Sequence, residues 1–167
     1  MRGTDLDAVI ALDAAAIDHN HTLVPLISAP AVERCASRRY WAGMRRRRDS
    51  RAFVAADGNA LLGMLCVDVR NARNRRMKIR RRVYLHSLYV EPRARGRRIA
   101  QRLIRHALAW AQRHGAGGAT LEMAANNDAA RALYGRFGFA VQEVMMARRL
   151  RQSALSARGA DPDAKVV

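Results

Sequence analysis

Cysteine is scarce in this chain, and so are the features that mark secreted or membrane-bound proteins. Its 167 residues include two cysteines, Cys35 and Cys66, which lie far apart and at no spacing typical of a metal site or a disulfide framework. No apolar run approaches the length of a membrane span, and the N-terminus lacks the apolar core of a signal peptide. We therefore expect a cytoplasmic protein without a bound metal or a membrane segment.

Proline is also rare, with four residues, while half of the chain is hydrophobic. This balance is typical of a globular protein, and the length suits one domain with its own core. We expect that domain over residues 1–150. The small and polar residues 151–167 are expected to form a flexible tail.

Acidic residues are few: 14 stand against 31 basic residues, which gives a net charge of +17. Nearly all of the basic residues are arginine, and they are densest over residues 45–48 and 73–82. Such clusters attract nucleic acid, ribosomes or acidic proteins, although a coding bias towards arginine would also produce them. The charge therefore leaves an acidic or nucleic-acid-associated partner open.

Two helices are predicted in the N-terminal part. The first covers about residues 5–17, with acidic residues in its first turn and an apolar stripe behind them. His19 and His21 are expected in a solvated loop. The second runs from Pro30 to about Arg48. Its candidates for burial are Val32, Cys35, Trp41 and Met44.

A hairpin follows, because residues 52–56 and 60–69 flank the turn sequence Asp57-Gly58-Asn59. The second of these strands is apolar on both faces, as expected of a strand that is covered on both sides. Residues 71–82 hold seven basic residues and no apolar face, which predicts an exposed loop or hairpin end.

The joint between residues 83–90 and 97–114 carries the strongest local signal. The run VYLHSLYV predicts a strand that ends at Glu91-Pro92, and an amphipathic helical pattern begins after the next few residues. Between them, four arginines surround Gly96. A turn from strand to helix presents free backbone N–H groups at the positive end of the helix dipole. The sequence therefore predicts a pyrophosphate site at this turn.

The C-terminal part predicts three more elements. Glycines at 115, 117 and 118 end the long helix. Residues 119–125 predict a strand, and residues 128–137 a short helix capped by Asn127 or Asp128. Residues 141–150 are expected to add a last strand.

Two stretches of this chain together resemble the GNAT superfamily of acyl-CoA N-acyltransferases. Arg95, Arg98 and Ala100 occupy the fixed positions of its cofactor motif, although Arg98 stands where the family has its inner glycine. Residues 127–139 match a second signature, N-x-x-A-x-x-L-Y-x-[KR]-x-G-F, at every fixed position. The family's first strand is short or absent here.

The resemblance implies an α/β GNAT fold, in which a mixed, mostly antiparallel sheet is splayed at its centre and has helices on both faces. It also implies an enzyme that moves an acetyl group from acetyl-CoA directly to a primary amine. The cofactor-binding residues would be Leu88, Tyr89 and Val90, through their backbone; Arg95, Gly96, Arg97, Arg98, Ile99 and Ala100, through their N–H groups; and Asn127. Arg93, Arg97 and Arg136 could meet the outer phosphates.

The same resemblance makes Tyr134 the acid that protonates the leaving thiolate. His86 and Glu122 are rival bases, and water alone is a third alternative. Period-two alternation puts His86 on one face with Tyr84 and Leu88, and an imidazole titrates in a useful range. Glu122 would have a raised pKa if it were buried.

The acceptor stays open between a protein or peptide and a small amine, and the protein between a monomer and a homodimer. A second function is also open: a non-catalytic GNAT-like module that binds CoA, RNA or the ribosome. Arg98 in place of glycine favours this alternative, and Asn127 with Tyr134 favours the enzyme.

Overall fold

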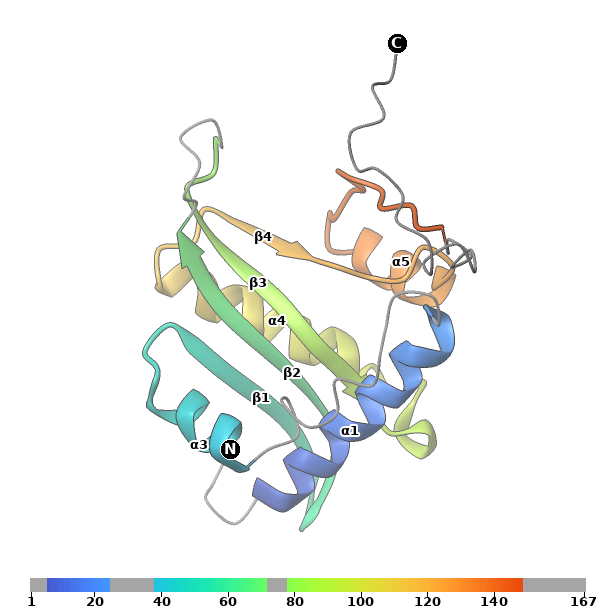
Figure 1. The fold of residues 1–167 in the computed structure, drawn as a ribbon. Coiled ribbons are helices and arrows are strands. Elements are labelled where there is room, and N and C mark those ends of the chain that lie inside the picture. Colours follow the sequence, from blue (N-terminus) through green and yellow to red (C-terminus); the bar gives the residue numbers. More distant parts are fainter. Residues whose placement is uncertain (1–5, 25–37, 72–77, 149–167) are drawn as a thin grey trace, which may run out of the picture.

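The protein has an α/β fold in which a sheet lies between helices (Figure 1). The structure, a computed structural model, describes residues 6–24, 38–71 and 78–148. Within these residues the strands are β1 (Ser50–Asp57), β2 (Ala60–Asn71), β3 (Arg81–Val90) and β4 (Gly118–Leu121), in that order across one sheet. The pairs β1–β2 and β2–β3 are antiparallel, and β3–β4 is parallel. This confirms the predicted mixed, mostly antiparallel sheet.

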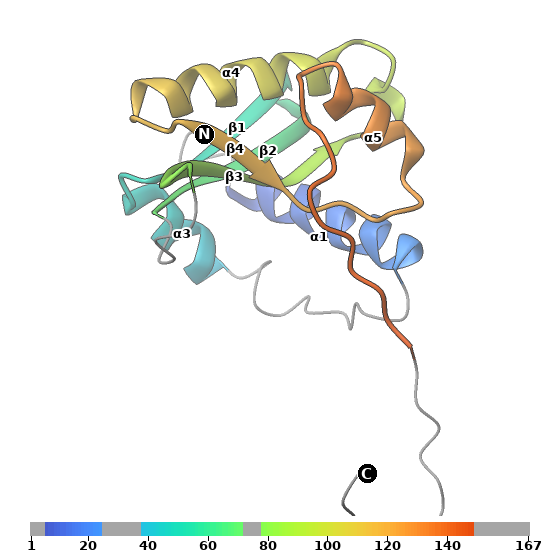
Figure 2. The same ribbon diagram turned by 90° about the horizontal axis from the view of Figure 1, so that it is seen from above.

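Helices cover both faces of the sheet, as predicted. Helix α1 (Leu6–Leu23) and helix α3 (Arg38–Arg46) lie on one face, and helix α4 (Ile99–Arg113) lies on the other (Figure 2). The short helix α5 (Asp128–Gly135) lies near the N-terminal end of α4 (Figure 2). The sheet thus separates two apolar layers.

Strand β2 shows this separation residue by residue. Leu65 and Val67 pack under α4, while Met64 and Cys66 pack against α1 and α3. All four side chains are fully buried. The prediction of a strand covered on both faces is confirmed, because alternating side chains of a strand point to opposite faces.

The predicted hairpin is also present. Asp57 pairs with Ala60, and Gly58 has a φ of 58°, in the left-handed region that glycine adopts without cost. The register shifts at Ala55 and Ala56, which bends the end of β1.

Helix α1 is longer than predicted. The loop expected at His19 and His21 is wrong, because the helix continues through both residues to Leu23. No glycine or proline interrupts the sequence before Pro25, and Thr22 Oγ1 donates a hydrogen bond to the His19 carbonyl at 2.7 Å. The predicted start of the second helix at Pro30, and Val32 and Cys35, lie outside the described residues; Trp41 and Met44 are buried as predicted.

Two predictions for the C-terminal strands are wrong. Strand β4 ends at Leu121 rather than at residue 125. Residues 141–148 form no strand, and Val141, Val144, Met145 and Met146 are 66% to 92% exposed. Apolar residues at these positions do not alternate with period two, so pairing would bury no single apolar face. Residues 149–150 and the expected tail lie outside the described residues.

Within the described part of the chain, no helix is both long and apolar enough to cross a membrane. Nor do three or more His, Cys, Asp or Glu side chains gather there in a way that could hold a metal ion.

Candidate functional site

Strands β3 and β4 separate in the middle of the sheet. Their pairing runs from Arg82–Gly118 to Leu85–Leu121 and then stops, while β3 continues to Val90. Among the described residues, no strand pairs with this last part of β3 on the β4 side. The backbone there is free to pair with something else.

A β-bulge at Ser87 lies at the start of this free edge. Cys66 pairs with His86 and Met64 with Tyr89, so one residue of β2 faces two residues of β3. Ser87 has a φ of 52°, in the left-handed region. The extra residue reverses the alternation, and Leu88 packs with the α4 layer while Tyr89 packs with the α1 layer. The prediction that Leu88 shares a face with Tyr84 and His86 is therefore wrong.

The turn after β3 leads directly into α4. A 3₁₀ turn, η2 (Pro92–Ala94), is followed by Gly96 with a φ of 77° and by Arg98 with a φ of 58° at the N-cap of α4. Among these described residues, the N–H groups of Gly96, Arg97 and Arg98 take part in no backbone hydrogen bond. The first-turn N–H groups of α4 also have no partner within the helix.

Arg95 differs from the prediction. Its N–H donates to the Pro92 carbonyl at 3.3 Å, so it is not free for a phosphate. Its side-chain Nε donates to the Val90 carbonyl at 3.2 Å. Arg95 thus ties the turn back to the end of β3, and the free N–H groups begin at Gly96.

A hollow of about 380 Å³ lies beside this turn, between α4 and α5. Its lining residues are Arg98, Gln101, Arg105, Arg136 and Phe137. Three guanidinium groups at the positive end of a helix dipole favour an anion with several phosphates. Sequence reasoning missed Gln101 and Arg105, although their positions three and seven residues after Arg98 place them on one helix face.

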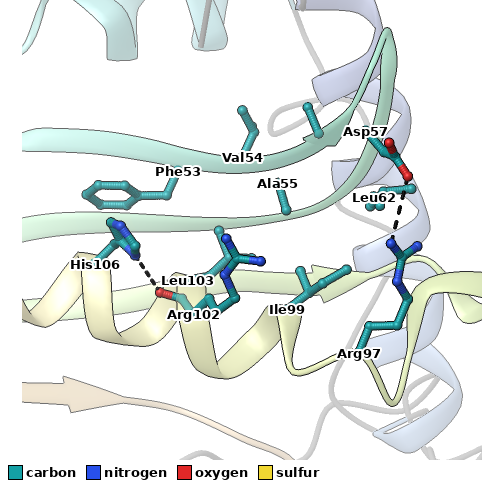
Figure 3. Close-up of a pocket in the computed structure, with 11 residues that line it drawn as sticks. Phe53, Val54, Ala55, Asp57, Leu62, Arg97, Ile99, Arg102, Leu103 and His106 are labelled. Atoms are coloured by element: carbon teal, nitrogen blue, oxygen red, sulfur yellow. Dashed lines mark hydrogen bonds and ion pairs between the residues drawn. The ribbon is translucent and has the colours of Figure 1, made fainter.

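A larger groove of about 450 Å³ lies on the opposite side of α4, against β1 (Figure 3). Arg97 points into it and lies 3.8 Å from Asp57, so this arginine is turned away from the hollow beside α5. His106 contacts the Arg102 carbonyl at 2.9 Å in the same groove. Neither the free edge of β3 nor any predicted catalytic residue lines the groove. We therefore place the candidate site at the β3–β4 opening, where the chemical groups are.

Tyr134 lies on α5 and packs in the α4 layer, together with Leu88 and Val90 from the free edge. Its ring meets Phe139 edge to face, with 5.7 Å between centroids. Burial raises the pKa of Tyr134 to about 12. The hydroxyl is therefore protonated at neutral pH and is available as a proton donor.

Asn127 is the N-cap of α5. Its side-chain oxygen accepts a hydrogen bond from the Ala130 N–H at 3.0 Å. The neighbouring Asn126 donates to the Leu23 carbonyl at 3.2 Å, which ties this loop to the end of α1.

His86 lies between polar groups on the α1 face of the sheet. Its Nε2 is 3.3 Å from Asp68 Oδ2, its Nδ1 is 3.4 Å from Ser87 Oγ, and its ring stacks on Tyr84. The pKa of Asp68 is held well below its usual range, chiefly by the hydrogen bond from His86 and also by the bond from Ser50 Oγ at 2.7 Å. Asp68 and Ser50 were missed from the sequence, where the only signal is a carboxylate in line with Met64 and Cys66 on β2.

Glu122 follows the end of β4 and is exposed, so the burial expected of it as a base is absent. It meets Tyr84 on β3. Burial raises the pKa of Tyr84 most, and the charge of Glu122 and a hydrogen bond with it raise that pKa further. Both rival bases thus lie beside Tyr84 on neighbouring strands.

Comparisons with known proteins agree on one family. Residues 20–139, more than half of the chain, match the model of the acetyltransferase (GNAT) family. The chain also resembles solved structures. A mutant of the BH1408 protein from Bacillus halodurans has a TM-score of 0.77 at 19% identity, covering 88% of this chain and 94% of that one. A GCN5-related N-acetyltransferase from Ralstonia eutropha JMP134 has a TM-score of 0.68 at 21% identity, covering 87% and 92%.

A third similar structure is AAC(6')-Iy in complex with the bisubstrate analogue CoA-S-monomethyl-acetylneamine. Its TM-score is 0.65 at 18% identity, and the match covers 90% of this chain and 95% of that one. At these identities the structures establish the shared fold. No curated protein sequence matches the chain.

Proposed function

This chain belongs to the GNAT acetyltransferase family, and we propose that it moves an acetyl group from acetyl-CoA directly to a primary amine. The observation that carries the proposal is the free edge of β3, which runs into a turn of unpaired N–H groups. A pantetheine arm can pair with such an edge as an added strand. The attached diphosphate would then meet the N–H groups at the start of α4.

The donor would be held by three sets of groups. The backbone of Leu88, Tyr89 and Val90 would pair with pantetheine. The N–H groups of Gly96, Arg97, Arg98, Ile99 and Ala100 would bind the diphosphate. Arg98, Arg105 and Arg136 would neutralise the remaining phosphate charge. The Asn127 oxygen is committed to its cap, so its Nδ2 is the group that would donate to the pantetheine arm.

In the reaction, the amine nitrogen attacks the thioester carbonyl carbon, a C–N bond forms, and the C–S bond breaks. Alignment of the two reactants supplies the largest share of the acceleration. The departing thiolate takes a proton from the Tyr134 hydroxyl, which regains one from solvent. The neutral state of that hydroxyl and its packing with Leu88 and Val90 support this role.

The amine must also lose a proton, and two groups are placed to take it. The His86 Nε2 is buried against Asp68, so His86 would act through a water. Glu122 is exposed and would act directly, with Tyr84 orienting it. Separate substitutions of the two residues, read as pH–rate profiles, distinguish them: loss of the basic limb identifies the base.

The acceptor class follows from charge. A net charge of +17 opposes the approach of polycationic amines, which favours a peptide, a protein N-terminus or a small amine of low charge. The bisubstrate analogue bound to AAC(6')-Iy joins CoA to an acetylated amine. This supports amine transfer as the type of reaction and does not name the acceptor here.

The test combines binding with turnover. Isothermal titration with acetyl-CoA should give a clear heat for the wild type, and Arg105→Ala should weaken binding several-fold. Arg113→Ala, at the other end of α4, is the matched control and should bind as the wild type does. A thiol-release assay over a panel of amines and peptides should then reveal acceptor-dependent release. Absence of acetyl-CoA binding would contradict the proposal.

One observation favours a second candidate, a module that binds CoA or RNA without turnover. Arg98 occupies a left-handed position where the family motif has glycine, and this places another guanidinium in the hollow. The module predicts acetyl-CoA binding, or a salt-sensitive RNA gel shift, with no thiol release for any acceptor.

A further inference from the structure

The open edge of β3 depends on the conformation of a single residue. Ser87 has a φ of 52°, which residues with a Cβ avoid because that atom approaches the next carbonyl. The bulge it forms comes two residues after the last β3–β4 pair, at Leu85. Without it, regular alternation would continue along β3. Something must hold Ser87 in this conformation.

Asp13 on α1 is the group that contacts Ser87 from the neighbouring layer. Only 1% of Asp13 is exposed. Burial raises the pKa of Asp13, although hydrogen bonds from Ser87 and Trp41 and the charge of His86 act in the opposite direction. Its Oδ2 and the Trp41 Nε1 each lack a partner in full hydrogen-bond geometry. A buried carboxyl without an arginine or lysine partner is costly, so a specific use is expected of it.

The hydroxyl of Ser87 is held from two sides. It donates to the Asp13 carboxylate, and it lies 3.4 Å from His86 Nδ1. On its far side His86 faces Asp68. Helix α1 is thus joined to β3 at the one residue whose backbone is left-handed.

We propose that Asp13 is a positioning residue, which holds Ser87 in its left-handed conformation and so keeps Leu88, Tyr89 and Val90 open to the acyl donor. This rests on the proposed function, since the donor is taken to be acetyl-CoA. Asp13 lies on the opposite face of the sheet from α4 and its phosphate-binding turn. It touches neither the donor nor the reacting atoms, and it acts through Ser87.

A cycle of substitutions tests this, because glycine adopts a φ of 52° without help. Asp13→Leu and Ser87→Ala should each weaken acetyl-CoA binding by about tenfold, measured by isothermal titration. Ser87→Gly should bind nearly as the wild type. The decisive variant is Asp13→Leu with Ser87→Gly, which should recover most of the lost affinity. Asp18→Asn, an exposed change on the same helix, is the control for charge.

Wild-type affinity in both Asp13→Leu and Ser87→Ala would overturn the proposal, and so would failure of Ser87→Gly to rescue Asp13→Leu. If Asp13→Leu does not fold, the comparison of Ser87→Ala with Ser87→Gly decides: equal affinities overturn it. Amide hydrogen exchange over residues 83–90 without any ligand is the second readout. If the wild type binds no acetyl-CoA but the exchange follows the same cycle, the proposed function fails and the role of Asp13 stands.

Discussion

A Cβ added to Gly63 on β2 would lie 2.7 Å from the main-chain oxygen of Tyr89 on β3. Gly63 pairs with Val90, just after the bulge has shifted the register between the two strands. The strands approach there more closely than any side chain permits. Glycine at this position is therefore part of how the free edge of β3 is placed.

Gly63→Ala should push Tyr89 and Val90 out of position and weaken acetyl-CoA binding about tenfold, with a loss of stability of about 1–3 kcal/mol. Isothermal titration and thermal melting measure the two effects. Gly43→Ala in α3 is the matched control, because nothing lies within 4 Å of its added Cβ. It should leave binding unchanged and raise the melting temperature slightly, as alanine favours the helix. Equal behaviour of the two variants would contradict the argument.

Arg98 should be a source of strain that the chain tolerates for its charge. Arg98→Gly and Arg98→Ala both remove the guanidinium, so both should weaken acetyl-CoA binding alike. Only the glycine relieves the left-handed backbone, and it should be more stable than the alanine variant by about 1 kcal/mol. This corresponds to roughly 2–4 °C in melting temperature. Equal melting temperatures would show that the backbone at this position is not strained in solution.

Tyr134→Phe should lower kcat about a hundredfold and leave acetyl-CoA affinity near the wild-type value, since only the proton donor is lost. The raised pKa also predicts a stability effect of defined sign. The folded state holds the proton more tightly than the unfolded state, so the wild type should lose stability as pH rises above about 10. The phenylalanine variant lacks this loss. Melting curves from pH 8 to 11 check it, and wild-type turnover in Tyr134→Phe would remove the acid assignment.

Asp68→Asn should destabilise the protein by about 1–3 kcal/mol at neutral pH, because the hydrogen bonds from His86 and Ser50 lose their charged acceptor. The pKa of Asp68 is lowered in the folded state. Its stabilisation is therefore fully present above pH 4 and is lost as pH falls further. The difference between wild type and variant should shrink below that pH. Asp57→Asn, which breaks only the exposed contact with Arg97, should show little effect at any pH.

The parts of the fold that sequence predicted well are those set by local pattern. Asp57-Gly58-Asn59 encodes its own turn, because Gly58 supplies the left-handed conformation that the hairpin needs. Helix α4 buries Leu103, Ile104 and Trp110 at helical spacing, and that spacing is visible in the sequence. The turn before α4 follows from the two elements that it joins.

The parts that sequence missed depend on distant partners. The bulge at Ser87 leaves no mark in VYLHSLYV, since its contact with Asp13 comes from another layer. Residues 122–125 have a strand-like pattern, but the opening of the sheet removes the neighbour they would pair with. Arg97 and Arg105 could not be sorted by charge alone. The rotational position of each on or beside α4 decides which hollow it faces.

The uneven burial of methionine gives the protein its own chemical reporter. Met64 is completely enclosed between the sheet and α1, whereas Met145 and Met146 are 74% and 92% exposed. A mild peroxide treatment would convert the outer thioethers to sulfoxides and leave Met64 untouched while the layers stay packed. Sulfur oxidation at Met64, read by mass spectrometry, therefore registers separation of α1 from the sheet.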